Sequence, residues 1–139
     1  MTSSQEASLD RLWARAVKKR DKGKCRCCQS EKLPTGMVFK MAGIGLAKHT
    51  FEAAHIMPCR HHSTRWLLEN GLNLCIRCHR YWTRAGQREW EKFVGMLIGK
   101  EPVRRLVELS KQIAKYQDFD EIKLYLALSI NDELARRAS

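Results

Sequence analysis

Residues 52–82 read EAAHIMPCRHHSTRWLLENGLNLCIRCHRYW, and this stretch decides the fold. It contains four of the five histidines of the chain and carries the pair Cys75 and Cys78 near its end. A second pair with the same two-residue gap, Cys25 and Cys28, lies upstream. Four thiolates in two such pairs are typical of a closed tetrahedral zinc site that holds a small fold together. We therefore predict a structural Zn²⁺ on these four cysteines.

The two pairs lie further apart than in a zinc ribbon. Residues 29–74, 46 in all, separate them, whereas the ligand pairs of a ribbon are about 15–20 residues apart. A segment is therefore inserted between the pairs, and it carries His55 and Asn70. Cys27 lies between the first two expected ligands, so another register of the first pair stays open.

The inserted segment and the histidine after the second pair give an ordered set of polar residues. They are His55 in AHI, Asn70 in ENGLNLC and His79 in LCIRCH. This order resembles the HNH (ββα-metal) nucleases, in the subgroup whose motif is inserted into a treble-clef zinc site. In that family the first histidine is the general base, the asparagine orients it or the hairpin around it, and the last histidine binds the catalytic metal. The resemblance implies these roles for His55, Asn70 and His79, with Mg²⁺ or Mn²⁺ as the catalytic ion.

The wider pattern is similar to phage nucleases of the NinG/Rap recombination type. The shared features are a helical start ending in KKRD, the HSTRW segment and an aromatic helical region after the second cysteine pair, over roughly residues 9–109. This resemblance implies hydrolysis of DNA phosphodiester bonds, on branched or recombination intermediates, in a phage or prophage context. The expected location is then the cytoplasm of a bacterial host cell. The preferred DNA structure stays open, as does a homodimer with two active sites.

One position departs from the HNH pattern. These enzymes commonly place Asp, Glu or His directly before the first catalytic histidine, as a second metal ligand, and here that position is Ala54. Either another side chain supplies the ligand, with Glu52, His61 and His62 as candidates, or the ion keeps more water. Mg²⁺ tolerates the second arrangement.

Composition favours a polyanionic partner. The chain of 139 residues has 26 Lys and Arg against 15 Asp and Glu, a formal charge of +11 and a pI near 9.7. We expect DNA before an anionic membrane. No stretch approaches the roughly 18 apolar residues of a membrane span, and residues 1–10 are polar, unlike a signal peptide. Paired cysteines without a secretory signal favour metal binding over disulfides.

Two basic segments are candidate DNA contacts. One is the polar face of the first expected helix, and the other lies between the two halves of the motif; their residues are Lys18, Lys19, Arg20, Arg60 and Arg65. The alternative for the helix is an ordinary solvated face. Trp66 either lines a nucleic-acid groove or packs in the core.

The length of the chain predicts one domain, residues 1–139. The helix and strand patterns, together with the resemblance to HNH nucleases, imply an α+β fold with a ββα-metal motif inside a treble-clef zinc-binding domain. An N-terminal helix region (1–24) precedes a zinc-bound HNH core (25–83) and a C-terminal helical region (84–139). Residues 1–7 are expected to be loose, with Ser8 capping a helix over 9–20. A strand is expected at 51–57, a turn and a second strand at 67–74, and a helix from about residue 78.

The remaining segments give weaker expectations. Residues 32–50 contain several glycines and predict an extended hairpin or loop, with His49 on the surface. Cys59 is expected to be a small buried side chain. In the C-terminal region an apolar stripe should end at Gly99, a further helix should begin at Pro102 with Ile113 turned inward, and Asp118 with Glu121 should cap the last helix.

Two other classes of function fit the zinc prediction. One is a non-catalytic zinc-finger module that binds DNA, which Ala54 favours. His55, Asn70 and His79 argue against it, because plain binding does not need them at nuclease spacing. The other is a zinc-dependent protein-interaction module, to which the net charge gives little support.

Overall fold

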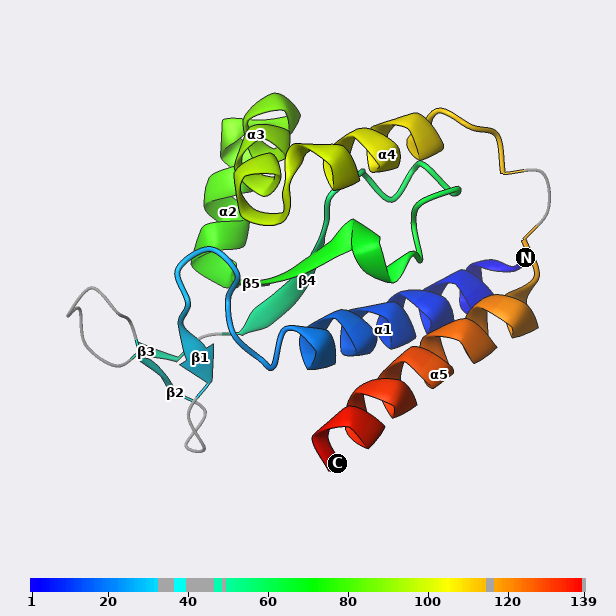
Figure 1. The fold of residues 1–139 in the computed structure, drawn as a ribbon, viewed down its shortest axis with the longest axis horizontal. Coiled ribbons are helices and arrows are strands. Elements are labelled where there is room, and N and C mark those ends of the chain that lie inside the picture. Colours follow the sequence, from blue (N-terminus) through cyan, green and yellow to red (C-terminus); the bar gives the residue numbers. More distant parts are fainter. Residues whose placement is uncertain (33–36, 40–46, 49, 115–116, 139) are drawn as a thin grey trace.

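The computed structural model describes residues 1–32, 37–39, 47–48, 50–114 and 117–138. Five helices and two small antiparallel sheets lie in this part of the chain (Figure 1). In chain order the elements are α1 (Ser3–Arg20), β1 (Glu31–Lys32), β2 (Met37–Phe39), β3 (Ala47–Lys48), β4 (Phe51–His55), a 3₁₀ turn (Leu68–Asn70), β5 (Gly71–Cys75), α2 (Ile76–Ala85), α3 (Gln87–Ile98), α4 (Lys100–Ser110) and α5 (Phe119–Ala138). The predicted α+β class is confirmed at this level.

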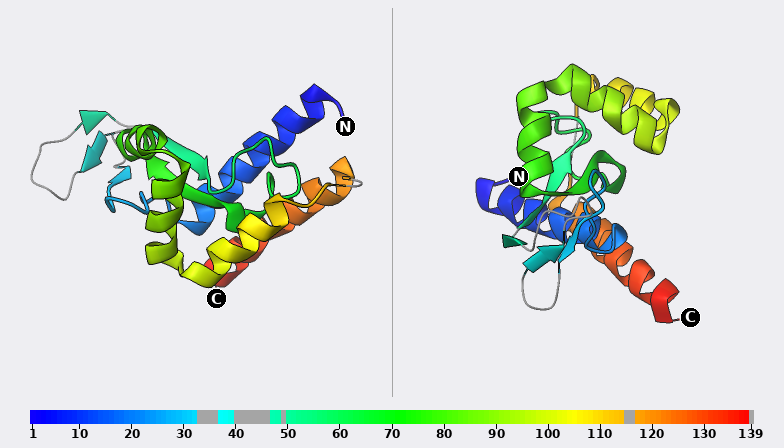
Figure 2. Two further views of the ribbon diagram at one scale, coloured as in Figure 1. Left: turned by 90° about the horizontal axis from the view of Figure 1, so that it is seen from above. Right: turned by 90° about the vertical axis from the view of Figure 1, so that its left-hand side faces the viewer.

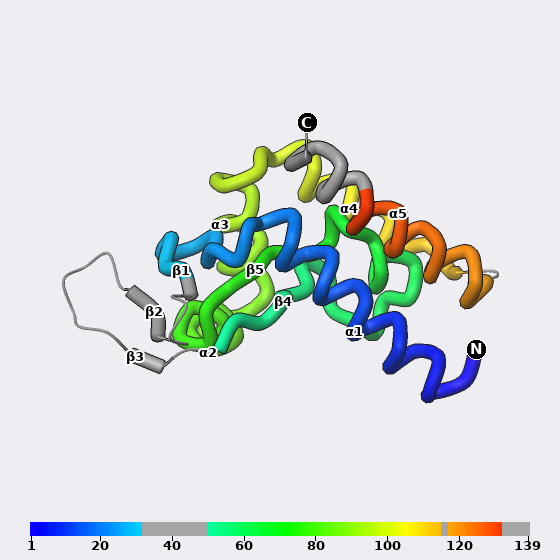
Figure 3. The backbone as a smooth tube through the Cα atoms, turned by 90° about the horizontal axis from the view of Figure 1, so that it is seen from below, coloured from blue at the N-terminus to red at the C-terminus, as the bar shows by residue number. Residues whose placement is uncertain are grey.

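The strands β4 and β5 form an antiparallel hairpin that lies between two layers of helices. Phe51 pairs with Cys75 at one end of the hairpin and His55 pairs with Gly71 at the other. The right-hand view of Figure 2 shows α1 and α5 on one side of the hairpin and α2, α3 and α4 on the other. From below, α1 crosses both strands (Figure 3). Side chains that alternate along β4 therefore face different helical layers.

Two apolar clusters match these two layers. The first joins the α2 side of the hairpin to α3 and α4, and includes Leu74, Trp90 and Leu106. The second joins α1 to α5 and includes Trp13 and Leu126. The C-terminal region that the sequence predicted as one unit thus contributes to both sides of the hairpin. Among the described residues, no helix has the length and apolar content of a membrane span.

Helix α1 begins earlier than the sequence analysis predicted. Thr2 is its N-cap and forms a capping box with Gln5, so residues 3–7 are helical and Ser8 is not the cap. One face of the helix is apolar and buried, with Leu9, Trp13, Ala16 and Val17 in the core and Leu12 partly buried beside them. A sequence signal existed, because Thr-x-x-Gln is a capping-box pattern.

Several other local predictions can be compared with the structure. Gly99 ends α3 with a positive φ of 103°, as predicted, but α4 begins at Lys100 rather than Pro102. Asp118 accepts a hydrogen bond from the amide of Glu121 at the start of α5, in agreement with the predicted cap. Two predictions of burial were wrong: Ile113 is 88% exposed and Cys59 is exposed.

A second small sheet follows the first cysteine pair. Strands β1, β2 and β3 pair in that order, all antiparallel. This agrees with the extended hairpin predicted for residues 32–50. The rest of that prediction, His49 included, lies outside the described residues.

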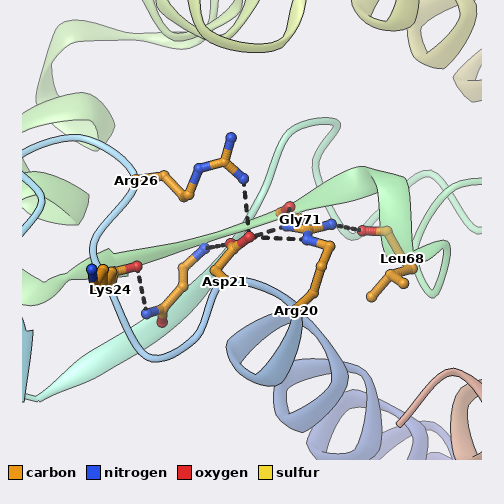
Figure 4. Close-up of polar contacts among 7 residues, drawn as sticks. Arg20, Asp21, Lys24, Arg26, Leu68 and Gly71 are labelled. Carbon is orange, nitrogen blue, oxygen red and sulfur yellow. Dashed lines mark hydrogen bonds and ion pairs between the residues drawn. The ribbon is translucent and has the colours of Figure 1, made fainter. Parts of the chain in front are cut away.

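A buried carboxylate, Asp21, joins the end of α1 to the hairpin (Figure 4). It accepts hydrogen bonds from the guanidinium groups of Arg20 and Arg26, at 3.0 Å, and from the backbone amide of Asn73, at 2.8 Å. Arg20 also donates to the carbonyl groups of Leu68 and Gly71. These contacts fix the register of α1 against β5.

Helix α1 approaches β5 closely at Gly71. A Cβ atom placed on Gly71 would lie 2.5 Å from the ring of Trp13 and 2.7 Å from the side chain of Val17. Both neighbours are buried, so neither can move freely. Only glycine allows this distance between helix and strand.

Replacement of Gly71 by alanine should therefore destabilise the protein. We expect Gly71→Ala to lower the free energy of unfolding by about 1–3 kcal/mol, as overpacking of a well-packed interior does. Denaturant unfolding followed by circular dichroism measures this change. The matched control is Gly95→Ala in α3, where an added Cβ meets only the side chain of Lys100 at 3.9 Å. The free energy of unfolding of that variant should rise by about 0.5–1 kcal/mol, because alanine is favoured over glycine within a helix. Equal effects of the two substitutions would contradict the close approach.

Candidate functional site

The four predicted zinc ligands come together at the junction of three elements. Cys25 and Cys28 lie in the turn that follows α1, Cys75 ends β5, and Cys78 lies in the first turn of α2. Their sulfur atoms all lie within 4.8 Å of one another, and those of Cys28 and Cys75 are 3.7 Å apart. Zn–S bonds of about 2.3 Å imply tetrahedral edges of about 3.8 Å. The cluster can therefore hold a structural metal ion such as Zn²⁺.

The backbone around the first pair is shaped for a negative charge. The amide of Cys28 donates to the sulfur of Cys25 at 3.5 Å. A hydrogen bond from the Cys78 thiol, helped by nearby backbone amides, lowers the pKa of Cys25 to about 5. The same hydrogen bond and burial raise the pKa of Cys78, because a second thiolate would lie beside the first. A divalent cation at the centre would relieve that repulsion, which is consistent with a metal-binding set.

The alternative register through Cys27 is not the one that the structure adopts. Cys27 lies outside the cluster and its sulfur accepts a hydrogen bond from the indole N–H of Trp82, at 3.4 Å. In the described ranges the four-cysteine set is the only group of three or more His, Cys, Asp or Glu side chains close enough to share a metal ion.

His55 ends β4 on the side that faces α1. Its ring stacks on Trp13, with centroids 3.9 Å apart and planes 10° from parallel. Its Nε2 atom lies 3.1 Å from the carbonyl oxygen of Arg65. A carbonyl can only accept, so Nε2 carries the proton and Nδ1 holds the free lone pair of the neutral ring. Burial lowers the pKa of His55 below its usual 6.5, which keeps the ring neutral at neutral pH.

The carbonyl that holds His55 is itself fixed by α1. Asp10 accepts two hydrogen bonds from the guanidinium of Arg65, at 3.1 and 2.8 Å, and one from the indole of Trp66, at 2.8 Å. Burial raises the pKa of Asp10, but the hydrogen bonds from Arg65 and Trp66 outweigh it, so the net shift is downward. Asp10 and Trp13 are thus parts of the site that sequence reasoning missed. Trp13 belongs to the buried face of α1 and Asp10 lies beside that face, but neither position indicated a contact with the segment around His55.

Asn70 is fully buried and ties together the chain that follows His55. Its side-chain oxygen accepts from the amide of Met57 at 2.7 Å, and its side-chain nitrogen donates to the carbonyl of Met57 at 3.1 Å. Its backbone carbonyl also accepts from the amide of Ile56. Asn70 therefore fixes the hairpin around the histidine. Asn73, three residues further along the chain, instead donates to the carbonyl of Lys24 next to the cysteine turn.

His79 lies on α2, one residue after Cys78. Its Nδ1 atom is 3.2 Å from a carboxylate oxygen of Glu52 on β4. His79, His55 and Ala54 line a cavity of about 350 Å³. The Ala54 side chain offers no ligand to that cavity, and neither His61 nor His62 is among the described residues that line it. His62 lies elsewhere, with its ring against the edge of Trp66.

The predicted DNA contacts have different surroundings. The guanidinium of Arg65 pairs with Asp10 and lies 3.6 Å from Glu6, and that of Arg20 is used inside the fold. Arg60 is exposed. Lys18 and Lys19 line a shallow hollow on α1 with further basic side chains, namely Arg11, Arg15 and Lys22. Trp66 is 4% exposed and packs in the core, which is the second of the two alternatives predicted for it.

A second basic surface was not predicted. Arg80 and Arg84 follow His79 along α2 and are exposed. With Glu52 and His79 they line a hollow of about 340 Å³ on the outer side of the helix. Their spacing of four residues was the signal, since it places both on one face of a helix.

Comparisons of this chain with protein-family models, with curated proteins and with solved structures found no match. The identification of the site therefore depends on its geometry. That geometry shows a cluster of four cysteines able to hold a metal ion, beside a cavity that two histidines share.

Removal of one cluster thiol should release the metal and unfold the protein. We expect the purified protein to contain one Zn²⁺ per chain by elemental analysis, and Cys78→Ser to lose it together with most of its cooperative thermal transition. The reason is that metal-binding energy in such small sites is folding energy. Cys59→Ser, an exposed thiol outside the cluster, is the control and should keep both. A well-folded protein that contains no metal would rule out the structural site.

Proposed function

We propose that this protein is a metal-dependent endonuclease of the HNH type, which hydrolyses phosphodiester bonds in DNA. The observation that carries the proposal is the placement of His55. Its Nε2 proton is held by the Arg65 carbonyl, it lines the same cavity as His79, and burial lowers its pKa, which favours the neutral ring. A general base needs this combination of a free ring nitrogen, a pKa below the working pH and access to a reacting water.

The order of the elements supports the HNH assignment. A hairpin of two strands is followed directly by a helix, with His55 at the end of β4, Asn70 just before β5 and His79 on α2. The cysteine turn, the hairpin and the first turn of α2 surround the thiol cluster, as expected for a treble-clef zinc site. In this proposal Zn²⁺ at the four cysteines is structural, because four thiolates leave no open position.

The chemistry of the chain's own residues follows from the tautomer of His55. Nδ1 takes a proton from a water molecule while the oxygen of that water forms a bond to phosphorus. The bond from phosphorus to the 3′ oxygen breaks, and its electron pair leaves with that oxygen, which takes a proton from solvent. The Arg65 carbonyl stabilises the imidazolium that forms, because Nε2–H donates to it throughout.

The residues at His79 fit a weakly held divalent cation. His79 offers one imidazole nitrogen and Ala54 offers none, so water and substrate oxygens would fill the other positions, which suits Mg²⁺ or Mn²⁺. When bound there, such an ion would stabilise the negative charge that develops on the phosphate and the leaving oxygen. His79 is well fixed for this task, since the neighbouring Cys78 belongs to the thiol cluster.

The surface charge supports a polyanionic partner, and the proposed activity makes that partner DNA. The net charge is +11, and exposed arginines lie on α2 beside His79 and on α1. Such surfaces contact phosphates without reading sequence. The resemblance of the sequence motifs to NinG/Rap-type nucleases leads us to propose branched recombination intermediates in a phage or prophage as the substrates, in a bacterial cytoplasm. A homodimer with two active sites is an open alternative to a monomer with one.

The base is tested by removing its ring. With supercoiled plasmid and Mg²⁺ or Mn²⁺, His55→Ala should cleave at least about 100-fold more slowly than the wild type, the usual effect of losing a general base. DNA affinity, measured by fluorescence anisotropy, should change little. Added imidazole should restore part of the cleavage, which a purely structural defect would not allow.

The pH dependence gives a second readout of the same experiment. Because the pKa of His55 is lowered by burial, its neutral form persists below pH 6.5, and wild-type cleavage should be level above that pH and decline only below it. Cleavage by His55→Ala at the wild-type rate would remove His55 from the mechanism. A wild-type protein that binds DNA but cleaves none with either cation would instead support the non-catalytic zinc module.

Ala54 accounts for the expected weakness of the cation site. Because its side chain lines the cavity beside His79, Ala54→Asp would add a carboxylate ligand there. We expect this variant to lower the Mg²⁺ or Mn²⁺ concentration needed for half-maximal cleavage from roughly millimolar values. Ala54→Asn, of the same shape without the charge, is the control and should show a smaller effect. An unchanged or higher requirement in Ala54→Asp would mean that another group already occupies this position.

A further inference from the structure

We propose that Glu52 is a positioning residue that sets the tautomer and orientation of His79, so that His79 presents Nε2 to a divalent cation. This inference rests on the proposed function of His79 and adds the residue that controls it. Ala54 occupies the position where HNH enzymes commonly place a metal ligand beside the base. Glu52 compensates by orienting His79, the one protein ligand that remains.

The position of Glu52 follows from the strand. Residues two apart on β4 lie on one face, so Glu52 and Ala54 share the face that looks toward α2. Glu52 pairs with Leu74 across the hairpin, one residue before Cys75. The thiol cluster fixes the start of α2 at the same end of the hairpin. The backbone on both sides of the Glu52–His79 contact is therefore held by the fold.

The contact determines which nitrogen of His79 is free. A carboxylate only accepts hydrogen bonds, so the 3.2 Å contact between Nδ1 of His79 and Glu52 places the proton on Nδ1. In the neutral ring Nε2, on the other edge, then holds the lone pair that a metal ion needs. Histidine ligands in proteins commonly donate their second ring N–H to a carboxylate in this manner.

Glu52 itself is not placed as a ligand in the cavity. His79 lines both the cavity beside Ala54 and the outer hollow, whereas Glu52 lines only the outer hollow, with Arg80 and Arg84. The side chains of Glu52 and His79 are 46% and 33% exposed. An exposed pair of this kind contributes little to folding stability, so substitution of Glu52 should leave the protein folded.

The test measures cation binding without measuring cleavage. Free Mn²⁺ is titrated by electron paramagnetic resonance against zinc-loaded protein, in the wild type, Glu52→Ala, Glu52→Gln and His79→Ala. Loss of such a supporting carboxylate typically weakens metal binding by about 10–100-fold. We expect that loss in Glu52→Ala and a smaller one in Glu52→Gln, because the amide oxygen can still accept from Nδ1–H. Glu89→Ala, which removes an exposed acid on α3, controls for the change in net charge and should bind Mn²⁺ as the wild type does.

The tautomer gives an independent readout. Without Mn²⁺, ¹⁵N correlation spectra of His79 should show Nδ1–H in the wild type and in Glu52→Gln, and a change toward Nε2–H in Glu52→Ala. Three results would overturn the inference. The first is a Mn²⁺ affinity and a His79 tautomer that do not change in Glu52→Ala. The second is a loss of Mn²⁺ affinity in Glu52→Gln as large as in Glu52→Ala, which would make Glu52 a direct ligand. The third is wild-type Mn²⁺ affinity in His79→Ala.

Cleavage assays on the same variants separate this inference from the proposed function. Glu52-dependent Mn²⁺ binding by a protein that cleaves no DNA would support the positioning role and remove the nuclease. DNA cleavage that requires His55, with Mn²⁺ binding independent of Glu52, would support the nuclease and overturn the positioning role.

Discussion

The structure depends on the meeting of four thiols at one junction. Cys25 and Cys28 follow the first helix, while Cys75 and Cys78 belong to the end of the hairpin and the start of the second helix. A short distance away, the buried carboxylate of Asp21 joins the same parts of the chain by hydrogen bonds. Both contacts fix the hairpin between its neighbours, which a two-stranded sheet could not achieve alone. His79 follows Cys78 directly, so the backbone that carries His79 is held by the thiol cluster.

The two faces of strand β4 contact different parts of the protein. On one face His55 lies against Trp13 and is held by a carbonyl that α1 fixes through Asp10. On the other face Glu52 contacts His79 on α2. The two histidines thus belong to different helical layers and share one cavity only because His55 is the last residue of its strand. Alternation along a single strand brings together parts that come from both sides of the protein.

Much of this arrangement is local and could be predicted from the sequence. Cysteine spacing identified the thiol cluster, and apolar and capping patterns predicted the helices α1, α3 and α5, because both kinds of signal are properties of neighbouring residues. Contacts between distant residues were not predictable. Nothing near Asp10 or Trp13 in the sequence indicates that they support His55, and the exposure of Ile113 and Cys59 reflects how the chain turns after a helix or a strand. The pairing of Glu52 with His79 needed the hairpin register, which gives Glu52 its place near the start of α2.

The layer formed by α1 and α5 has a consequence for how the protein is made. Helix α1 is the first described element to leave the ribosome, and its buried stripe must wait for the hairpin and then for α5, whose Leu126 packs in the same cluster. Domains that unite distant segments complete their packing only when those segments have been synthesised. The surroundings of His55, which include Trp13 from α1, are therefore assembled late. A nascent chain that ends within the helices after the hairpin would already hold all four thiols, yet it would lack α5, which packs against the cluster that contains Trp13.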